Sequence, residues 1–295
     1  MDNNIYNVRR IAAGIILYNP DTQRLEQNIT AILPQVSELY LIDNASASSS
    51  WSECIAKVAP DAKVITLKNK KNEGIAVALN QMMRLGQERG MDWVLTLDQD
   101  SVCPPDMISL MLPYARSMAR AGILCPVIAD RSFGIEHLPS QTEHITQLKE
   151  CITSASLTRV KAWEEAGGFD PQLFIDAVDT DFCLTLRAHG WQIIQVNGIQ
   201  LTHEIGHQAT LHVLFGRRYI AFNHAPFRYY FMARNLVYLS RKHPGYLQPA
   251  PFRCIPTLLA RMFVILCWER DEKFAKCRQI IRGFLDGCKS FASST

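Results

Sequence analysis

The chain has 295 residues, of which 48% are hydrophobic and 20% are charged. This composition supplies one sizeable core and excludes disordered and fibrous proteins. The nine cysteines form no CxxC pair and their number is odd, which favours a reducing compartment over a disulfide scaffold. We expect no signal or transit peptide, because the N-terminus MDNNIYNVRR carries an acid and no long apolar run.

Strand-like and helical patterns alternate through the first half of the chain. Buried strands are predicted at Ile11–Leu17, Leu39–Ile42, Lys63–Leu67 and Trp93–Leu97, and helices at Leu25–Leu33, Trp51–Val58 and Ile75–Arg89. The alternation predicts a mostly parallel sheet covered by helices. In such sheets, ligands bind in a crevice at the C-terminal ends of the strands.

A polar turn follows each of the four predicted strands. The turns are Tyr18-Asn19-Pro20, Asp43-Asn44-Ala45-Ser46, Asn72-Glu73-Gly74 and Asp98-Gln99-Asp100. We expect these turns to line one pocket, because they come at consecutive strand ends. The first turn carries neither GxGxxG nor GxxxxGK(S/T), so another group must neutralise any phosphate that binds there.

Asp98 and Asp100 can neutralise phosphate through a divalent cation. Carboxylates are hard oxygen ligands suited to Mg²⁺ or Mn²⁺, and the cation would bridge them to a pyrophosphate. The alternation in D-x-D predicts that both side chains lie on the same side of an extended segment. A solvated turn is the alternative, and the apolar run WVLTL directly before the pair makes a site the stronger interpretation.

The second half begins with a predicted strand at Ala121–Ile128 and a polar stretch, residues 130–150, predicted to be an irregular loop over the site. Thr153–Val160 then leads into a helix that ends at Gly167-Gly168. Later predicted elements are a helix at Phe182–His189 and a strand at Ile193–Leu201, which ends near His203.

Three carboxylates lie within six residues, at Asp176, Asp179 and Asp181. Their mutual repulsion would be relieved by a helix N-terminus or a cation. The alternative is structural, with Asp179 as a helix N-cap and the other two side chains solvated.

His203-Glu204-Ile205-Gly206-His207 matches the HExxH signature of zinc metalloproteases. That signature requires a helix and a third ligand. Here it follows a β-type run, contains a glycine, and lacks any Asp or Glu between Ile205 and Trp268. A protease is therefore the weaker interpretation. His203 alone, at a strand end, could complete a metal site with Asp100.

The C-terminal part of the chain is basic. Ile205–Thr295 holds 14 Lys and Arg against 4 Asp and Glu, a net charge of +10. Basic and apolar residues at helical spacing favour a membrane surface over nucleic acid. The 14-residue apolar stretch Ile255–Trp268 contains Arg261 and is too short to span a bilayer, so residues 229–289 are predicted to form amphipathic helices. These helices could instead pack on the catalytic domain or form a dimer interface.

Several segments together resemble the family 2 glycosyltransferases, and most closely the bacterial rhamnosyltransferases that build O-antigen and related surface polysaccharides. The segments are IILYNP, LYLIDNAS, NEGIAVALNQ, WVLTLDQDS, GGFDPQLFIDAVDTDFCLTLRAHGW and RYYFMARN. The resemblance covers about residues 10–240. It implies a GT-A fold at residues 1–225, with a nucleotide-binding half at about 1–128, an acceptor-binding half at about 129–225, and a helical extension at 226–295.

The resemblance also implies roles for individual residues. Asp43 would contact the nucleobase and Asp179 would be the catalytic base. Asp98, Asp100 and His203 would bind Mn²⁺ or Mg²⁺. Val178 stands where the family has an acidic residue beside the base. The other predicted donor ligands are Tyr18, Asn19, Asn44, Asn72, Gly74, Asp98 and Gln99, and the predicted acceptor ligands are Ser154, Asp176 and Asp181.

The chemistry expected from these residues is a single inverting displacement. A carboxylate base would remove the proton of the acceptor hydroxyl, and the cation would stabilise the departing diphosphate. We expect dTDP-L-rhamnose as donor, with a UDP- or GDP-sugar as the alternative. The expected acceptor is a saccharide, linked to polyprenyl diphosphate, at the cytoplasmic face of the membrane. A non-catalytic nucleotide-binding or membrane adaptor is the remaining alternative.

Overall fold

The computed structural model describes residues 10–59, 63–130, 134–135, 143–203, 209–214, 216–243, 245–246 and 253–289. The chain forms two compact units. Unit 1 comprises Met1–Gln172 and Phe182–His203, and unit 2 comprises Leu173–Asp181 and Glu204–Thr295. The predicted functional division at residue 225 follows different boundaries and stays a prediction.

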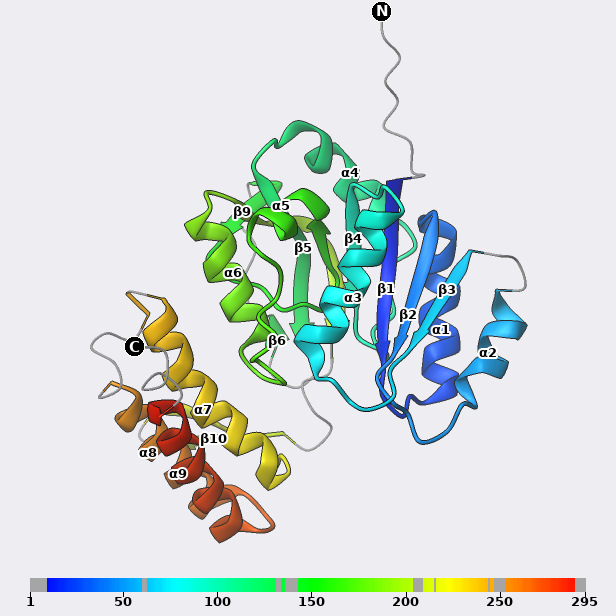
Figure 1. Cartoon of the computed structure of the whole chain (residues 1–295). Helices are drawn as coiled ribbons and strands as arrows, with labels where there is room; N and C mark the ends of the chain where they lie inside the picture. The colour runs from blue at the N-terminus through cyan, green and yellow to red at the C-terminus, as the bar shows by residue number, and fades with distance from the viewer. Residues whose placement is uncertain are drawn as a thin grey trace, which may run out of the picture. The chain divides into compact units, whose positions relative to one another are not determined.

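Unit 1 is built on a mixed sheet whose first half is parallel (Figure 1). The strand order is β3 (Val64–Lys68), β2 (Glu38–Asp43), β1 (Ile11–Leu17), β4 (Trp93–Leu97), β8 (Ser156–Arg159), β5 (Ala121–Asp130), β9 (Gln192–His203) and β7 (Ile145–Leu148), with β6 (Gly134–Ile135) paired to β5. The neighbours β3, β2, β1 and β4 pair in parallel, so their C-terminal ends lie at one edge of the sheet. Strand β8 is antiparallel to both of its neighbours.

Helices cover both faces of this sheet. Ile11, Ala13 and Ile15 of β1 share an apolar core with residues of α1 (Thr22–Ile32) and α4 (Met107–Ser117). Gly14 points to the other face, where a Cβ atom would come within 2.3 Å of the Sδ atom of Met82 in α3 (Ile75–Glu88). Strand β1 is therefore apolar throughout, as expected of a strand covered on both sides. The remaining helices are a short 3-10 helix (Leu33–Gln35), α2 (Trp51–Val58), α5 (Val160–Glu165) and α6 (Val178–Ala188), whose first turn belongs to unit 2.

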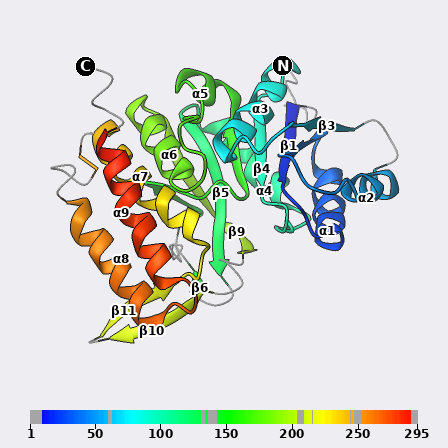
Figure 2. The same cartoon turned by 60° about the horizontal axis from the view of Figure 1, so that its bottom comes forward.

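Besides the segment Leu173–Asp181, the described residues of unit 2 form a hairpin and three helices, and the helices lie side by side in Figure 2. The hairpin is β10 (Thr210–Leu214) and β11 (Arg217–Ala221), and the helices are α7 (Pro226–Lys242), α8 (Cys254–Trp268) and α9 (Lys273–Lys289). Helices α7 and α9 approach closely at two glycines: a Cβ at Gly283 would lie 2.2 Å from the Tyr230 carbonyl oxygen, and one at Gly287 would lie 2.9 Å from that of Arg234. Within the described residues, no helix has the length and apolarity that crossing a membrane requires.

The predicted fold class is confirmed, since a mixed, mostly parallel sheet is flanked by helices and followed by C-terminal helices. The irregular loop predicted over residues 130–150 is wrong at two places: Gly134–Ile135 forms β6 and pairs with β5, and Ile145–Leu148 forms β7 and pairs with β9. As an edge strand, β7 is only partly buried, so its sequence lacks the apolar run of a central strand. The prediction also omitted α4 and the β10–β11 hairpin, and it placed the start of α6 at Phe182 instead of Val178.

Candidate functional site

The four predicted polar turns meet at one edge of the sheet in unit 1. Leu17 pairs with Asp43 at the ends of β1 and β2, and Asp43 pairs with Lys68 at the end of β3. On the other side of β1, Ile15 pairs with Leu97, the last residue of β4. The parallel register therefore brings the turns after these strands together, as expected for a ligand crevice.

Two side chains hold the turn after β4 in place. The Gln99 Oε1 atom accepts a hydrogen bond from the Tyr18 amide at 2.9 Å, and the Gln99 Nε2 group donates to the Tyr18 carbonyl at 3.4 Å. Asn28 of α1 donates to the Asp98 carbonyl at 2.7 Å. The Gln99 amide, predicted as a donor ligand, thus holds the rim of the site in place.

The D-x-D segment has a different conformation from the one predicted. The Ser101 amide donates to the Asp98 carbonyl at 3.2 Å, which closes a four-residue turn. The segment is therefore not extended, so alternation does not place the two carboxylates on the same side. Asp98 is half-buried and Asp100 is exposed, so the turn presents at least one carboxylate to solvent.

Asp43 is a fully buried carboxylate at the end of β2. Its Oδ1 atom accepts from the Ser46 amide at 2.9 Å. Its Oδ2 atom is buried without a hydrogen-bond partner and lies 3.8 Å from the Nζ atom of Lys68, a half-exposed side chain. A buried carboxylate oxygen without a hydrogen bond is costly, by about 1–3 kcal/mol or more. This oxygen is therefore a candidate acceptor for a ligand N–H group.

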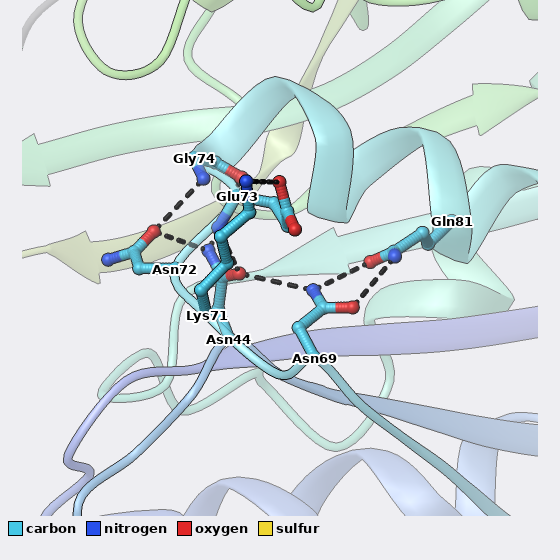
Figure 3. Close-up of polar contacts among 7 residues, drawn as sticks. All are labelled: Asn44, Asn69, Lys71, Asn72, Glu73, Gly74 and Gln81. Carbon is cyan, nitrogen blue, oxygen red and sulfur yellow. Dashed lines mark hydrogen bonds and ion pairs between the residues drawn. The ribbon is translucent and has the colours of Figure 1, made fainter.

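Asn44 organises the turn before α3 (Figure 3). Its Nδ2 group donates to the Asn72 Oδ1 atom at 2.9 Å and to the Gly74 carbonyl at 3.3 Å. Its Oδ1 atom accepts from the Glu73 amide at 3.0 Å and from Asn69 at 3.1 Å. Asn44 and Asn72 therefore bind each other and the backbone, and the turn they fix is the boundary of the site.

Three residues of these turns have left-handed backbone conformations. Asn19 has a φ of 49°, Ala45 of 68° and Gly74 of 86°. For a residue with a Cβ atom, this conformation costs about 1–2 kcal/mol. Hydrogen bonds offset the cost, since the Asn19 amide donates to Ser46 Oγ and the Asn19 side chain accepts from the Ala47 amide. Backbone strain of this kind concentrates at functional sites.

The three predicted acceptor ligands all make internal contacts. Ser154 is buried in unit 1, with its Oγ atom 3.0 Å from that of Ser101. In unit 2, Asp176 is paired with Arg228, and Asp181 is buried against Lys242 and His243. Acceptor binding by these residues stays a prediction.

Asp179 lies inside the first turn of α6, one residue after the helix begins. Its Oδ1 atom accepts from the Thr180 amide at 2.9 Å. A carboxylate at this place is stabilised by the helix dipole. The N-cap alternative therefore does not apply, because the residue is already helical.

The donor set of the D-x-D turn fits a divalent cation. Mg²⁺ is commonly held by one or two protein carboxylates together with substrate phosphates and water. Asp98 and Asp100 match that requirement. Among the described side chains, no three His, Cys, Asp or Glu residues form a group that could hold a metal ion by themselves. The side chain of the third predicted ligand, His203, lies outside the described part of the structure.

The backbone at His203 argues against the zinc protease. Residues up to His203 form strand β9, and His203 pairs with Asp130 of β5. The HExxH signature needs its first histidine on a helix. The rest of the motif, Glu204 to His207, lies outside the described residues.

Sequence reasoning missed several residues that shape the site. Asn28 is fully buried on the apolar face of α1, among Leu25, Ile29 and Ile32. A polar residue in such a stripe is a usable signal, because burying an amide requires a partner. Asn69 and Gln81, which bind each other through two hydrogen bonds at 2.8 and 3.0 Å, gave no comparable signal.

Comparison with known proteins identifies the family. The sequence profile described as "Glycosyl transferase family 2" matches residues 13–167. The chain is 30% identical over 260 residues to the dTDP-rhamnosyl transferase RfbF of Shigella flexneri, and the match covers 82% of each protein. The chain belongs to glycosyl transferase family 2. It is a glycosyltransferase that uses a nucleotide-sugar donor, and it lies near the rhamnosyltransferases of the family.

Solved structures support the GT-A fold of this family member. The mannosyltransferase PcManGT from Pyrobaculum calidifontis, in complex with GDP-Man and Mn²⁺, matches 97% of this chain and 76% of its own, with a TM-score of 0.57 at 14% identity. GalNAc-T7 with UDP, GalNAc and Mn²⁺ matches 70% of this chain and 44% of its own, with a TM-score of 0.54 at 14% identity. At these identities the likeness concerns the fold alone.

The Asn44 network gives a prediction for stability and binding. Asn44→Ala removes bonds to the Asn72 side chain and to the Glu73 and Gly74 backbone. We expect the free energy of unfolding to fall by about 2–4 kcal/mol, because each lost hydrogen bond contributes roughly 1 kcal/mol and burial adds to the loss. We also expect weaker binding of the nucleoside diphosphate. Gln81→Ala is the control, since it leaves these Asn44 bonds intact. Equal stability and binding in the two variants would contradict the role given to Asn44.

Proposed function

We propose that this glycosyltransferase transfers L-rhamnose from dTDP-L-rhamnose, with inversion, to a hydroxyl of a saccharide acceptor. The acceptor would be carried on polyprenyl diphosphate at the inner face of the cell membrane, in surface polysaccharide synthesis. The similarity to a dTDP-rhamnosyl transferase supports the sugar and the nucleotide. The alternative donors are UDP- and GDP-sugars.

The observation that carries the nucleotide assignment is the buried Asp43 carboxylate. Its Oδ1 atom is engaged by the Ser46 amide, whereas its Oδ2 atom has no hydrogen-bond partner. Thymine and uracil each present one N–H group, at N3, between two carbonyls. Guanine presents two adjacent N–H groups, which suit a carboxylate with both oxygens available. One remaining oxygen therefore favours a pyrimidine, provided that the half-exposed Lys68 side chain moves aside.

The proposed chemistry assigns a separate task to each group of residues. Asp179 takes the proton of the acceptor hydroxyl as that oxygen bonds to the anomeric carbon and the bond to the diphosphate breaks. Tyr18, Asn19, Asn44, Asn72 and Gly74 border the bound nucleotide. Asp98, Asp100 and His203 would hold Mn²⁺ or Mg²⁺, which supplies positive charge to the departing diphosphate.

A membrane role is proposed for the exposed apolar face of α8 in unit 2. The exposed residues Ile255, Leu259, Phe263 and Leu266 follow one another at intervals of three or four along α8 and so share a face. Exposed Arg253 and Arg270 lie just outside the two ends of the helix. A basic, apolar surface of this kind complements an anionic bilayer, with the helix lying in the interface.

A donor screen tests the proposed function. We expect release of dTDP from dTDP-rhamnose in the presence of a saccharide acceptor, UDP as a weaker competitor, and GDP as the weakest. Asp43→Asn should raise the donor KM by about 10- to 100-fold, as expected for losing a hydrogen bond to a charged group. Glu38→Gln is the matched control, because Glu38 lies at the other end of β2 and pairs with Arg89. Turnover of a GDP-sugar alone would reject the pyrimidine assignment.

The metal site gives a second prediction. Asp100→Ala should lower kcat by about a hundredfold or more and should abolish the Mn²⁺ dependence of donor affinity measured by calorimetry. Asp92→Asn is the control, because Asp92 lies just before β4, at the opposite end from the D-x-D turn, and pairs with Arg10. His203→Ala should lose activity that added Mn²⁺ partly restores, whereas His207→Ala should be mild. Donor binding that is the same with and without a chelator would exclude a metal role.

Vesicle binding tests the membrane surface. Full-length protein should co-sediment with vesicles containing anionic lipid at low salt and should dissociate as salt screens the charges. Replacing Leu259 and Phe263 together by Ser should weaken binding, because both side chains are exposed apolar groups. Leu110→Ser, an exposed leucine in α4, is the control. Equal binding to neutral vesicles, or none to anionic ones, would contradict the proposal and leave packing or dimerisation as the role of these helices.

A further inference from the structure

Helix α7 carries a row of polar residues, two of which are the first and last residues of the segment RYYFMARN. Arg228, Asn235 and Lys242 follow one another at intervals of seven residues. Two turns of an α-helix take 7.2 residues, so these three side chains share one face. All three contact the segment Ile175–Asp181, which belongs with α7 to unit 2.

That segment has a backbone that needs support. Asp176 and Ala177 both have a φ of 64°, in the left-handed region. Two consecutive left-handed residues with Cβ atoms cost about 2–4 kcal/mol together, at 1–2 kcal/mol each. Such a conformation persists only where surrounding groups determine it. Asp179 comes two residues after Ala177, in the first turn of α6.

Asn235 holds the backbone before Asp179. It is fully buried, and its Nδ2 group donates to the carbonyl oxygens of Ile175 and Asp176, each at 2.8 Å. Its Oδ1 atom accepts from Arg234 at 2.9 and 2.7 Å. One amide proton is thus directed at the carbonyl of the strained Asp176 and the other at that of the residue before it, and Arg234 fixes the orientation of the amide.

Arg228 and Lys242 hold side chains on either side of Asp179. The Arg228 guanidinium binds the Asp176 carboxylate in a two-pronged arrangement, with its Nη2 atom 2.9 Å from Oδ1 and its Nε atom 3.2 Å from Oδ2. Lys242 Nζ lies 2.9 Å from the Asp181 carboxylate, and His243 Nε2 lies 2.7 Å from it. Burial, followed by the charge of Arg228, lowers the pKa of His224 to about 4, so this ring adds no positive charge to the Arg228–Asp176 pair near neutral pH.

We propose that Arg228, Asn235 and Lys242 of α7 are positioning residues that hold the carboxylate of Asp179 for proton abstraction. The proposal rests on the role of Asp179 in the proposed function. It gives Asp176, predicted as an acceptor ligand, a supporting role as the partner of Arg228. A catalytic base must reach the acceptor proton at hydrogen-bonding distance, and an error of about 1 Å can cost on the order of a hundredfold in rate.

The alternative is that these contacts only stabilise unit 2. Helix α7 has a separate attachment to α9, through the close approaches at Gly283 and Gly287 and through Arg241, whose Nη1 atom donates to the Cys288 carbonyl at 2.9 Å. Arg241→Ala therefore serves as a control: it weakens the packing of the same helix while sparing the contacts of the three positioning residues.

The experiment compares kcat, the KM values for donor and acceptor, and thermal stability in full-length variants. Asn235→Ala and Arg228→Gln should lower kcat by about 10- to 100-fold with the donor KM nearly unchanged. Arg228→Lys keeps the charge but not the two-pronged geometry and should recover part of the loss. In a double-mutant cycle, the variant that combines Arg228→Gln with Asp176→Asn should be no slower than Arg228→Gln alone, because both substitutions break the same ion pair. Arg241→Ala should lower the Tm with kcat unchanged.

Other results would overturn the proposal. A kcat near wild type in Arg228→Gln and Asn235→Ala, with only the Tm lowered, would make the contacts structural. A raised acceptor KM in Asp176→Asn at constant kcat would assign Asp176 to acceptor binding. The Asp179→Asn variant tests the proposed base separately from the positioning role of α7. If that variant stays active, the proposed base is wrong; if it is inactive while the α7 variants remain fast, only the positioning role is wrong.

Discussion

The parallel pairing of β1, β2, β3 and β4 is the constraint on which the donor site depends. Helices cover β1 on both sides, so its residues are apolar on both faces and the polar groups of this region fall where the strands end. Parallel register then collects those ends at one edge. The hydrogen bonds of Asn44 and Gln99 tie neighbouring turns to one another, so the turns of the candidate site share one hydrogen-bonded frame.

Charge is separated along this chain in a way that suits a transferase with a diphosphate leaving group. The D-x-D turn and Asp43 place carboxylates at the edge of the sheet where, under the proposed function, a cation would offset their charge against an anionic nucleotide. The basic residues gather instead in the last third of the sequence, where Ile205–Thr295 has a net charge of +10. Some of these residues form ion pairs within unit 2, as Arg228 and Lys242 do. The net charge therefore overstates the number of basic side chains that could contact a membrane.

The sequence allowed prediction of the sheet and of most strand ends, because a strand buried on both faces must be apolar and a turn after it must be polar. Ile11–Leu17 and Trp93–Leu97 follow that rule and have the predicted bounds. Prediction from the sequence failed for β7, a partly exposed edge strand. It also failed for the D-x-D turn, whose Ser101–Asp98 hydrogen bond depends on the local fold. The contacts of α7 with Ile175–Asp181 join residues 52 to 61 positions apart, and periodicity within one helix does not reveal its partner.

Unit 2 is formed by two separate segments of the chain, and this has a genetic consequence. The segment that carries the proposed base, Leu173–Asp181, comes from the middle of the chain, whereas the helices of unit 2 come from the end. A premature stop codon after the hairpin would leave the donor edge of the sheet intact while removing every contact that α7 makes with the segment. Under the proposed function, alleles of this kind would encode a protein that keeps its proposed nucleotide-binding groups but has lost the support of its base. Scoring donor binding and turnover separately would reveal such alleles.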